Sequence, residues 1–231
     1  MGKKKYYAVR VGEVPGIYLT WDDAKEQVQG YSGGQYKSFE NILDAEKYLL
    51  GEDNKDEKKD YIEMVNNEIK KEIEKLGPDQ VIAFVDGSYS SDVEGEERYG
   101  YGAVLITKES ETCLSGSYDK MDYMTSRNVA GEIEGVKNAI LWAIENKKKE
   151  IIVYYDYEGI EKWAKKQWKA NKELTLGYRN FYGEKLKLIK VDFRHVKAHS
   201  GIYYNEKADE LAKKSLYLPV EKPSVVHTTL E

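Results

Sequence analysis

Hydrophobic and polar residues alternate in short runs through the first 50 residues. The runs KYYAVRVG and GIYLT predict two strands joined by the turn VPG. The segment TWDDAKEQV has a threonine cap and early acids, which predicts a helix, and YKSFEN predicts a third strand. A second helix is expected in ILDAEKYLLG, ending at its glycine. We therefore expect a small ββαβα domain over residues 1–51.

The pattern changes to dense charge over residues 52–80. After GEDNKDEKKD, apolar residues recur at helical spacing at Ile62, Val65, Ile69, Ile73 and Leu76. This spacing predicts a helix that ends before Gly77 and Pro78, within a charged and partly helical linker. Such a helix can either pack on a neighbouring domain or act as a spacer.

Runs of β-branched and aromatic residues alternate with helical patterns over residues 81–218. Strands are expected in VIAFVDGSY, GYGAVLIT, TCLSGSY, EIIVYYD and KLIKVDFRHV, and helices near 130–146, 158–170, 175–185 and 204–216. Strands come first and then alternate with helices, which predicts an α/β domain with a mixed five-stranded sheet and helices on its faces. Residues 219–231 contain two prolines and no periodic pattern, so we expect a poorly ordered tail.

Composition is that of a globular protein, with 41 % hydrophobic and 12 % aromatic residues in 231. The single cysteine excludes a disulfide framework within the chain. The net charge of −5 argues weakly against a nucleic-acid partner, but most of the excess acid lies in 52–80 and the flanks are near neutral. No apolar run is long enough for a signal or a membrane span, so we expect a soluble, cytoplasmic protein.

Four carboxylates occupy unusual places in this pattern. Asp86 and Asp156 each end an apolar strand, and Glu132 and Asp209 border the apolar faces of two helices. Each has an ordinary explanation when taken alone. Asp86 fits a turn, Asp156 fits a helix cap, and the two helical acids fit solvated positions.

A common explanation for all four acids is a metal site. Converging carboxylates at the border of a core repel one another, and divalent cations relieve that cost. Oxygen ligands without cysteine or clustered histidine favour Mg²⁺ or Mn²⁺. Two such ions about 4 Å apart serve in-line displacement at a phosphate. The sequence therefore predicts two ions held by Asp86, Glu132, Asp156 and Asp209.

Neighbouring residues add a family resemblance over about 81–216. The segments VDGSY, RNVAGEIEGVKNAI, YYDYEGIEKW and VKAHSGIYYNEKADELAKKS resemble ribonuclease H of type 1, in the same order. The resemblance implies that the four acids are catalytic and that His199 aids proton transfer or product release. The alternative is that His199 is a loop histidine without a role. Asn128 and Asn205 match positions that contact an RNA–DNA hybrid in its minor groove.

Other residues of this segment are candidates for binding the nucleic acid. Backbone amides near Ser88 are expected to meet 2′-hydroxyl groups. Arg127 stands where many family members have a small hydroxyl residue, which changes the expected phosphate pocket. Trp168 lies in the lysine-rich segment WAKKQWKANKELT, which resembles the basic protrusion of some members. A solvated helix face is the alternative for these lysines.

The first 50 residues resemble the small hybrid-binding, or viroplasmin-like, domain that precedes many such enzymes. By that match, Tyr7, Trp21 and Tyr36 pack against sugar or base of the DNA strand, and Lys37 meets phosphate. Aromatic faces with a nearby cation hold nucleic acid with little sequence preference. The alternative is that Trp21 and Tyr36 are the core of a very small domain.

Taken together, these features predict an endoribonuclease that hydrolyses the RNA strand of RNA–DNA hybrids, leaving 5′-phosphate and 3′-hydroxyl ends. The expected partner is a hybrid duplex, with no membrane and no obligate protein partner. Two other functions stay open from the sequence. One is a non-catalytic tethering protein, and the other is a DNA-cleaving nuclease of the same fold.

Overall fold

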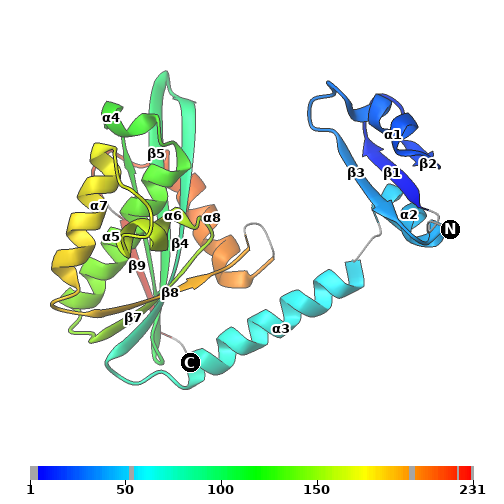
Figure 1. Cartoon of the computed structure of the whole chain (residues 1–231). Helices are drawn as coiled ribbons and strands as arrows, with labels where there is room; N and C mark the ends of the chain where they lie inside the picture. Colours follow the sequence, from blue (N-terminus) through cyan, green and yellow to red (C-terminus); the bar gives the residue numbers. More distant parts are fainter. Residues whose placement is uncertain (1–4, 52–54, 198–200, 223, 230–231) are drawn as a thin grey trace. The chain divides into compact units, whose positions relative to one another are not determined.

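The computed structural model describes residues 5–51, 55–197, 201–222 and 224–229. The chain divides into two compact units, Met1–Tyr61 and Ile62–Glu231, and each is described by itself (Figure 1). Across the described residues, no helix has the length and apolar character needed to cross a membrane.

The smaller unit contains a three-stranded antiparallel sheet in the order β2-β1-β3, with two helices. The helices begin as their sequences predict, because the side chains of Thr20 and Asn41 accept hydrogen bonds from backbone N–H groups of the first turn. The predicted ββαβα order is confirmed. Its elements are β1 (Tyr6–Val11), β2 (Gly16–Tyr18), α1 (Trp21–Val28), β3 (Gln35–Phe39) and α2 (Ile42–Leu49).

The larger unit is built on a mixed sheet in the order β8-β7-β4-β5-β6-β9. Strands β4, β5, β6 and β9 pair antiparallel, whereas β7 and β8 run parallel to β4. The strands are β4 (Gln80–Val93), β5 (Glu96–Ile106), β6 (Ser110–Tyr118), β7 (Glu150–Tyr155), β8 (Lys190–His195) and β9 (Ser224–Thr229).

Helices cover both faces of this sheet, as predicted for an α/β domain (Figure 1). Alternate residues of β4 point to opposite faces, so that Val81, Ala83 and Val85 join the core under α5. Ile82 and Phe84 join the core of the other face, under α3 and α8. The helices are α3 (Lys55–Glu74), α4 (Met121–Met124), α5 (Asn128–Glu145), α6 (Gly159–Ala164), α7 (Glu173–Lys185) and α8 (Tyr203–Ser215).

The prediction of a poorly ordered tail is wrong, and with it the number of strands. Residues Ser224–Thr229 form β9, which pairs with the edge strand β6 over six residues. The segment SVVHTT is rich in β-branched residues, and the open N–H and C=O groups of β6 give it a pairing partner. The sheet therefore has six strands in the described part of the chain, where five were expected.

The linker helix is not a free spacer along its whole length. Ile69 and Leu76 are 3 % and 5 % exposed and belong to the same core cluster as Ile82 and Phe84. The hydroxyl of Tyr154 on β7 donates a hydrogen bond to Glu72 of α3. The second half of α3 is thus packed against the larger unit.

Candidate active site

Strand pairing places Asp86 and Asp156 side by side. In the parallel pair of β4 and β7, Phe84 lies opposite Tyr154. Two residues further along each chain come Asp86 and Asp156, just beyond the part of β4 that pairs with β7. Asp156 follows the last residue of β7, as predicted, but Asp86 does not end its strand, because β4 stays paired with β5 beyond it and runs on to Val93. Asp86 is only 9 % exposed. The apolar strands that precede the two acids fix them at the edge of the core.

Glycines bring the helix that carries Glu132 close to these two acids. A Cβ on Gly87 would lie 2.1 Å from the carbonyl oxygen of Asn128 and 2.3 Å from the backbone nitrogen of Glu132. A Cβ on Gly131 would lie 2.0 Å from the carbonyl oxygen of Gly100. Only glycine allows such an approach of backbones. Residues adjacent to Asp86 and Glu132 therefore set how near α5 comes to β4 and β5.

Asp209 comes from the opposite face of the sheet, on α8. This helix packs closely on β5, because a Cβ on Gly102 would lie 2.2 Å from the carbonyl oxygen of Ala208. Asp209 is 9 % exposed, and its Oδ2 lies 2.5 Å from the Nζ of Lys213, one turn further along α8. Lys213 was not among the predicted site residues, although its spacing of four residues from Asp209 was the available signal.

The acids influence one another electrostatically. Burial, then the charge of Asp156 and then that of Asp209, together raise the pKa of Asp86 to about 7. Burial also raises the pKa of Glu132 well above its ordinary value, with the charges of Asp156 and Asp86 as the next causes. The backbone N–H groups of Asp156 and Tyr157 both donate to Oε1 of Glu132, at 3.4 Å.

These carboxylates have the chemistry of a divalent-cation site. Buried oxygen donors that raise one another's pKa values are costly when ionised, and Mg²⁺ or Mn²⁺ relieves that cost. In the described ranges, no group of three or more His, Cys, Asp or Glu side chains is arranged to hold a metal ion as it stands. Ligation by three of the acids therefore requires side-chain adjustment from the arrangement seen.

The two histidines near the site differ in what the structure shows of them. The predicted residue His199 lies outside the described residues. His195, at the end of β8, places its Nε2 3.0 Å from the backbone carbonyl oxygen of Asp156. The sequence analysis proposed no role for His195, since a histidine within a strand is usually structural. Its contact ties the last residue of β8 to the end of β7.

The remaining candidates on the larger unit have varied exposure. Arg127 and Asn128 are exposed at the start of α5, and Ser88 is half-buried on β4. The guanidinium of Arg127 lies 5.8 Å from the ring centre of Tyr89. Asn205 is only 2 % exposed, on the first turn of α8, so this arrangement does not present it to a nucleic acid.

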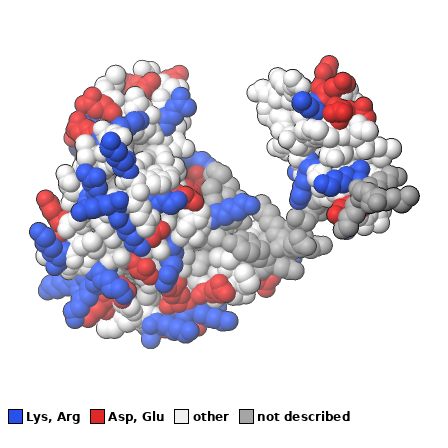
Figure 2. All heavy atoms as spheres, in the orientation of Figure 1, with Lys and Arg blue, Asp and Glu red and all other residues white. Residues whose placement is uncertain are grey.

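A pocket of about 400 Å³ opens beside the start of α5. Trp168 packs edge-on against two aromatic residues, at 6.3 Å from Tyr157 and 5.9 Å from Trp163. In the view of Figure 2, lysine and arginine atoms are spread over the larger unit between acidic residues. The pocket is lined by Thr125, Ser126, Val129, Tyr157, Trp163, Lys169, Asn171, Lys172 and Thr175.

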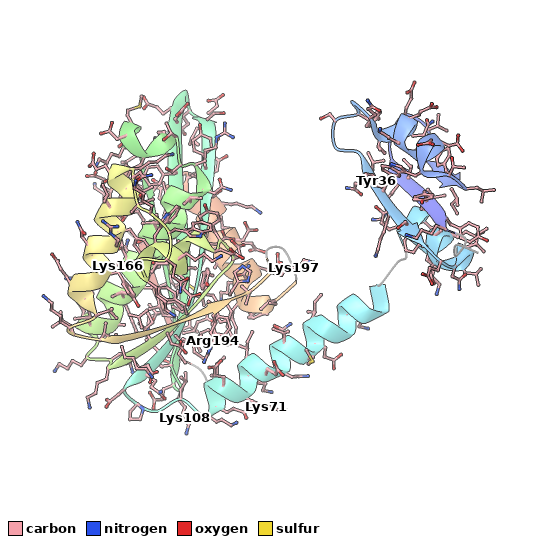
Figure 3. The ribbon with its side chains drawn as sticks, in the orientation of Figure 1. Tyr36, Lys71, Lys108, Lys166, Arg194 and Lys197 are labelled. Carbon is pink, nitrogen blue, oxygen red and sulfur yellow. The ribbon has the colours of Figure 1, made fainter. Side chains whose placement is uncertain are left out.

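The smaller unit carries an exposed aromatic cluster. The ring of Trp21 lies 5.8 Å from that of Tyr7 and 4.9 Å from that of Tyr36 (Tyr36 is labelled in Figure 3). Trp21 and Tyr36 are 36 % and 48 % exposed, which contradicts the alternative that they form the core of this domain. Lys37 points to the other face of β3, with its Nζ 5.3 Å from the ring centre of Phe39.

Comparison with known proteins agrees with this organisation. The family described as "Ribonuclease H1 N-terminal domain" matches residues 5–49, and the family described as "RNase H" matches residues 78–217. The second match covers more than half of the chain. The chain belongs to the ribonuclease H family. It is accordingly an enzyme of the ribonuclease H class, with the N-terminal domain found in ribonuclease H1.

Individual relatives match different shares of this ribonuclease H. A "Ribonuclease H" of Schizosaccharomyces pombe is 24 % identical over 92 % of this chain and 97 % of its own length. "Ribonuclease HI" of Haemophilus influenzae is 32 % identical over 62 % of this chain and 93 % of its own length. The crystal structure of RNase H1 from Halobacterium salinarum is 21 % identical over 59 % of this chain and 97 % of that chain, with a TM-score of 0.47.

Proposed function

We propose that this ribonuclease H is an endonuclease that hydrolyses the RNA strand of RNA–DNA hybrids with two metal ions. The observation that carries the proposal is the electrostatic coupling of Asp86, Glu132 and Asp156, with Asp209 acting on the same site. A set of mutually repelling, buried acids needs a cation to stay ionised near neutral pH.

Within this proposal, Asp86, Glu132, Asp156 and Asp209 hold the ions, which are Mg²⁺ or alternatively Mn²⁺. Bound there, the ions supply an activated water and stabilise the leaving 3′ oxygen, so that the products carry 5′-phosphate and 3′-hydroxyl ends. The two backbone N–H groups that bind Oε1 of Glu132 orient its carboxylate towards the neighbouring acids. His199 is proposed to assist proton transfer or product release.

Choice of strand and affinity for the hybrid are assigned to other residues. Exposed Asn128 and the backbone beside Ser88 are proposed to contact 2′-hydroxyl groups across the minor groove. The aromatic cluster of Tyr7, Trp21 and Tyr36 offers stacking faces for the DNA strand, consistent with the match to a ribonuclease H1 N-terminal domain.

Two weakly binding units on one chain raise the effective concentration of the hybrid at the active site. The smaller unit is therefore proposed to increase processivity more than the chemical rate. Lys37, Arg127 and Trp168 are further candidate contacts of the hybrid. The single cysteine fits a reducing compartment, so a cytoplasmic location belongs to the same proposal.

The test offers three labelled substrates in Mg²⁺ buffer: an RNA–DNA hybrid, a duplex DNA and a single-stranded RNA. We expect cleavage of the RNA strand of the hybrid alone, and the loss of at least about a hundredfold in rate for Asp156→Asn. Asp192→Asn is the matched control, because Asp192 forms an ion pair with Arg194 on the same strand, β8. This variant is expected to keep full activity.

Each alternative has its own result in this experiment. Cleavage of duplex DNA without cleavage of the hybrid would show a DNA nuclease of the same fold. Binding of the hybrid without cleavage by the unsubstituted chain would show a tethering protein. Analysis of the product ends by enzymatic labelling distinguishes 5′-phosphate from 3′-phosphate products, and the latter would exclude the proposed two-ion reaction.

A further inference from the structure

Helix α8, which carries Asp209, begins without a cap of its own. The first N–H groups of an α-helix have no partner within the helix and are usually satisfied by a polar side chain just before it. Here the N-cap residue is Ile202, whose side chain makes no capping hydrogen bond. Among the described residues, a partner for the first turn of α8 comes from another element.

The missing cap comes from the linker helix. The Oδ1 of Asn66, on α3, accepts a hydrogen bond of 3.0 Å from the backbone N–H of Tyr203, the first residue of α8. Asn66 and Tyr203 are 137 residues apart in the chain. A side-chain oxygen at this place also meets the positive end of the helix dipole, which strengthens the interaction.

Two further contacts hold the same two elements together. A Cβ on Gly201 would lie 2.9 Å from the Cδ1 of Ile62, so this glycine is already close to α3. Ile202 is 1 % exposed and shares a core cluster with Ile69. Ile62, Asn66 and Ile69 follow the spacing of one helix face, so one side of α3 lies along the start of α8.

The α3 side of this contact lies outside the segments that match known families, whereas Tyr203 lies within the second match. Those matches cover residues 5–49 and 78–217, whereas Ile62–Glu74 of α3 lies between them. The second half of α3 nevertheless belongs to the larger compact unit. Similarity to ribonuclease H therefore assigns no role to Asn66.

We propose that Asn66 is a positioning residue of the active site, and that it acts by capping α8. The helix has 13 residues, and Asp209 lies less than two turns from its capped end. Fixing that end fixes how Asp209 approaches Asp86. This inference rests on the proposed function, because its main readout is cleavage of the hybrid.

The alternative is that Asn66 only stabilises the fold, as a hydrogen bond between two packed helices can do. The two roles differ in what they predict for a protein that remains folded. A stabilising residue changes the unfolding temperature and leaves kcat unchanged well below it. A positioning residue changes kcat in the folded protein, and a substitution that restores the acceptor restores the rate.

The experiment uses the full chain with four substitutions. Asn66→Ala removes the acceptor, and Asn66→Asp keeps an oxygen in place. Asn67→Ala is the matched control on the adjacent, exposed position of the same helix. Tyr154→Phe removes the hydrogen bond to Glu72, which anchors α3 at another point. For each variant, kcat and KM on the hybrid are measured with Mg²⁺ at a temperature where circular dichroism shows a folded protein.

We expect kcat of Asn66→Ala to fall about fivefold, the rate equivalent of the ~1 kcal/mol typical of an N-cap. KM should change less than twofold, and Asn66→Asp should return kcat to within about twofold of the unsubstituted chain. Asn67→Ala should match the unsubstituted chain, and Tyr154→Phe should lower the unfolding temperature without lowering kcat. Amide hydrogen exchange at Tyr203 should be faster in Asn66→Ala than in Asn66→Asp.

The proposal is overturned if Asn66→Ala keeps its kcat, or if Asn66→Asp is as slow as Asn66→Ala. If Asn66→Ala does not fold, Asn66→Gln takes its place, since the longer side chain displaces the same acceptor, and the same two outcomes apply. An unsubstituted chain that binds the hybrid and cannot cleave it would refute the proposed function instead, and hydrogen exchange at Tyr203 would still report on the cap.

Discussion

The substitution Gly87→Ala tests whether backbone contact between β4 and α5 assembles the site. The added Cβ would start 2.1 Å from the carbonyl oxygen of Asn128, and ordinary contact begins near 3.4 Å, so strand and helix must separate by about 1.3 Å. The two nearest atoms, the carbonyl oxygen of Asn128 and the backbone nitrogen of Glu132, both belong to the backbone, so no side chain can rotate to make room. Overpacking of this kind costs roughly 1–3 kcal/mol.

The same displacement moves Glu132 relative to Asp86. A misplacement near 1 Å in an active site costs about a hundredfold in rate. We therefore expect Gly87→Ala to lose about a hundredfold in kcat on the hybrid and to lower the unfolding temperature by roughly 2–12 °C. The assays are single-turnover cleavage with Mg²⁺ and thermal unfolding followed by circular dichroism.

Gly177→Ala is the matched control, because a Cβ on Gly177, in α7, meets nothing within 4 Å. It should keep full activity and should raise the unfolding temperature slightly, since alanine favours a helix over glycine by roughly 1 kcal/mol. The reasoning would be refuted by a Gly87→Ala protein with unchanged kcat and unchanged stability, which would mean that α5 tolerates displacement.

Three other predictions follow from the site and the smaller unit. First, without metal, burial and the charge of Asp156 raise the pKa of Asp86 from 3.8 to about 7, so the folded protein retains a proton that the unfolded chain releases. The stability that this group contributes therefore falls as the pH rises from about 4 to 7. Asp86→Asn should raise the unfolding temperature at about pH 8 but hardly change it at about pH 4. An equal effect at both pH values would contradict this prediction. Second, Lys213→Met should tighten Mg²⁺ binding about threefold in titration calorimetry, because the ammonium group that it removes lies 2.5 Å from Oδ2 of Asp209. The control is Lys214→Met, which loses only the exposed ion pair with Glu210. Weaker Mg²⁺ binding by Lys213→Met would contradict this prediction. Third, Trp21→Ala should weaken hybrid binding by about 1–3 kcal/mol, measured by fluorescence anisotropy. Tyr31 is also exposed in the smaller unit, and Tyr31→Ala should leave the affinity unchanged. Equal losses of affinity in the two variants would argue against a defined aromatic face.

Apart from the short helix α4 and the last strand β9, the sequence was sufficient for the order of strands and helices, because apolar periodicity is a local signal. It also indicated Asp86 and Asp156, since an acid that follows a buried apolar run interrupts the pattern. Their proximity then follows from the parallel pairing of β4 and β7. The ββαβα order and the α/β class are confirmed by the same local logic.

Contacts between distant segments were not accessible from the sequence. The close backbone approach at Gly87 depends on how α5 crosses the sheet, which no periodic pattern encodes. Asn66 and Tyr203 lie too far apart in the chain for their contact to be visible. The tail was mispredicted because its prolines were given more weight than the run SVVHTT, whose partner is the edge of β6.

The last strand of the sheet has a consequence for biosynthesis. Strand β9 is made from the final residues of the described chain, and it pairs with β6, which was translated long before. Until Ser224–Thr229 has been translated, β6 presents an unpaired edge, and such edges promote association between chains. Nascent chains stalled before Ser224 should thus be more prone to aggregate than chains in which β9 has been made.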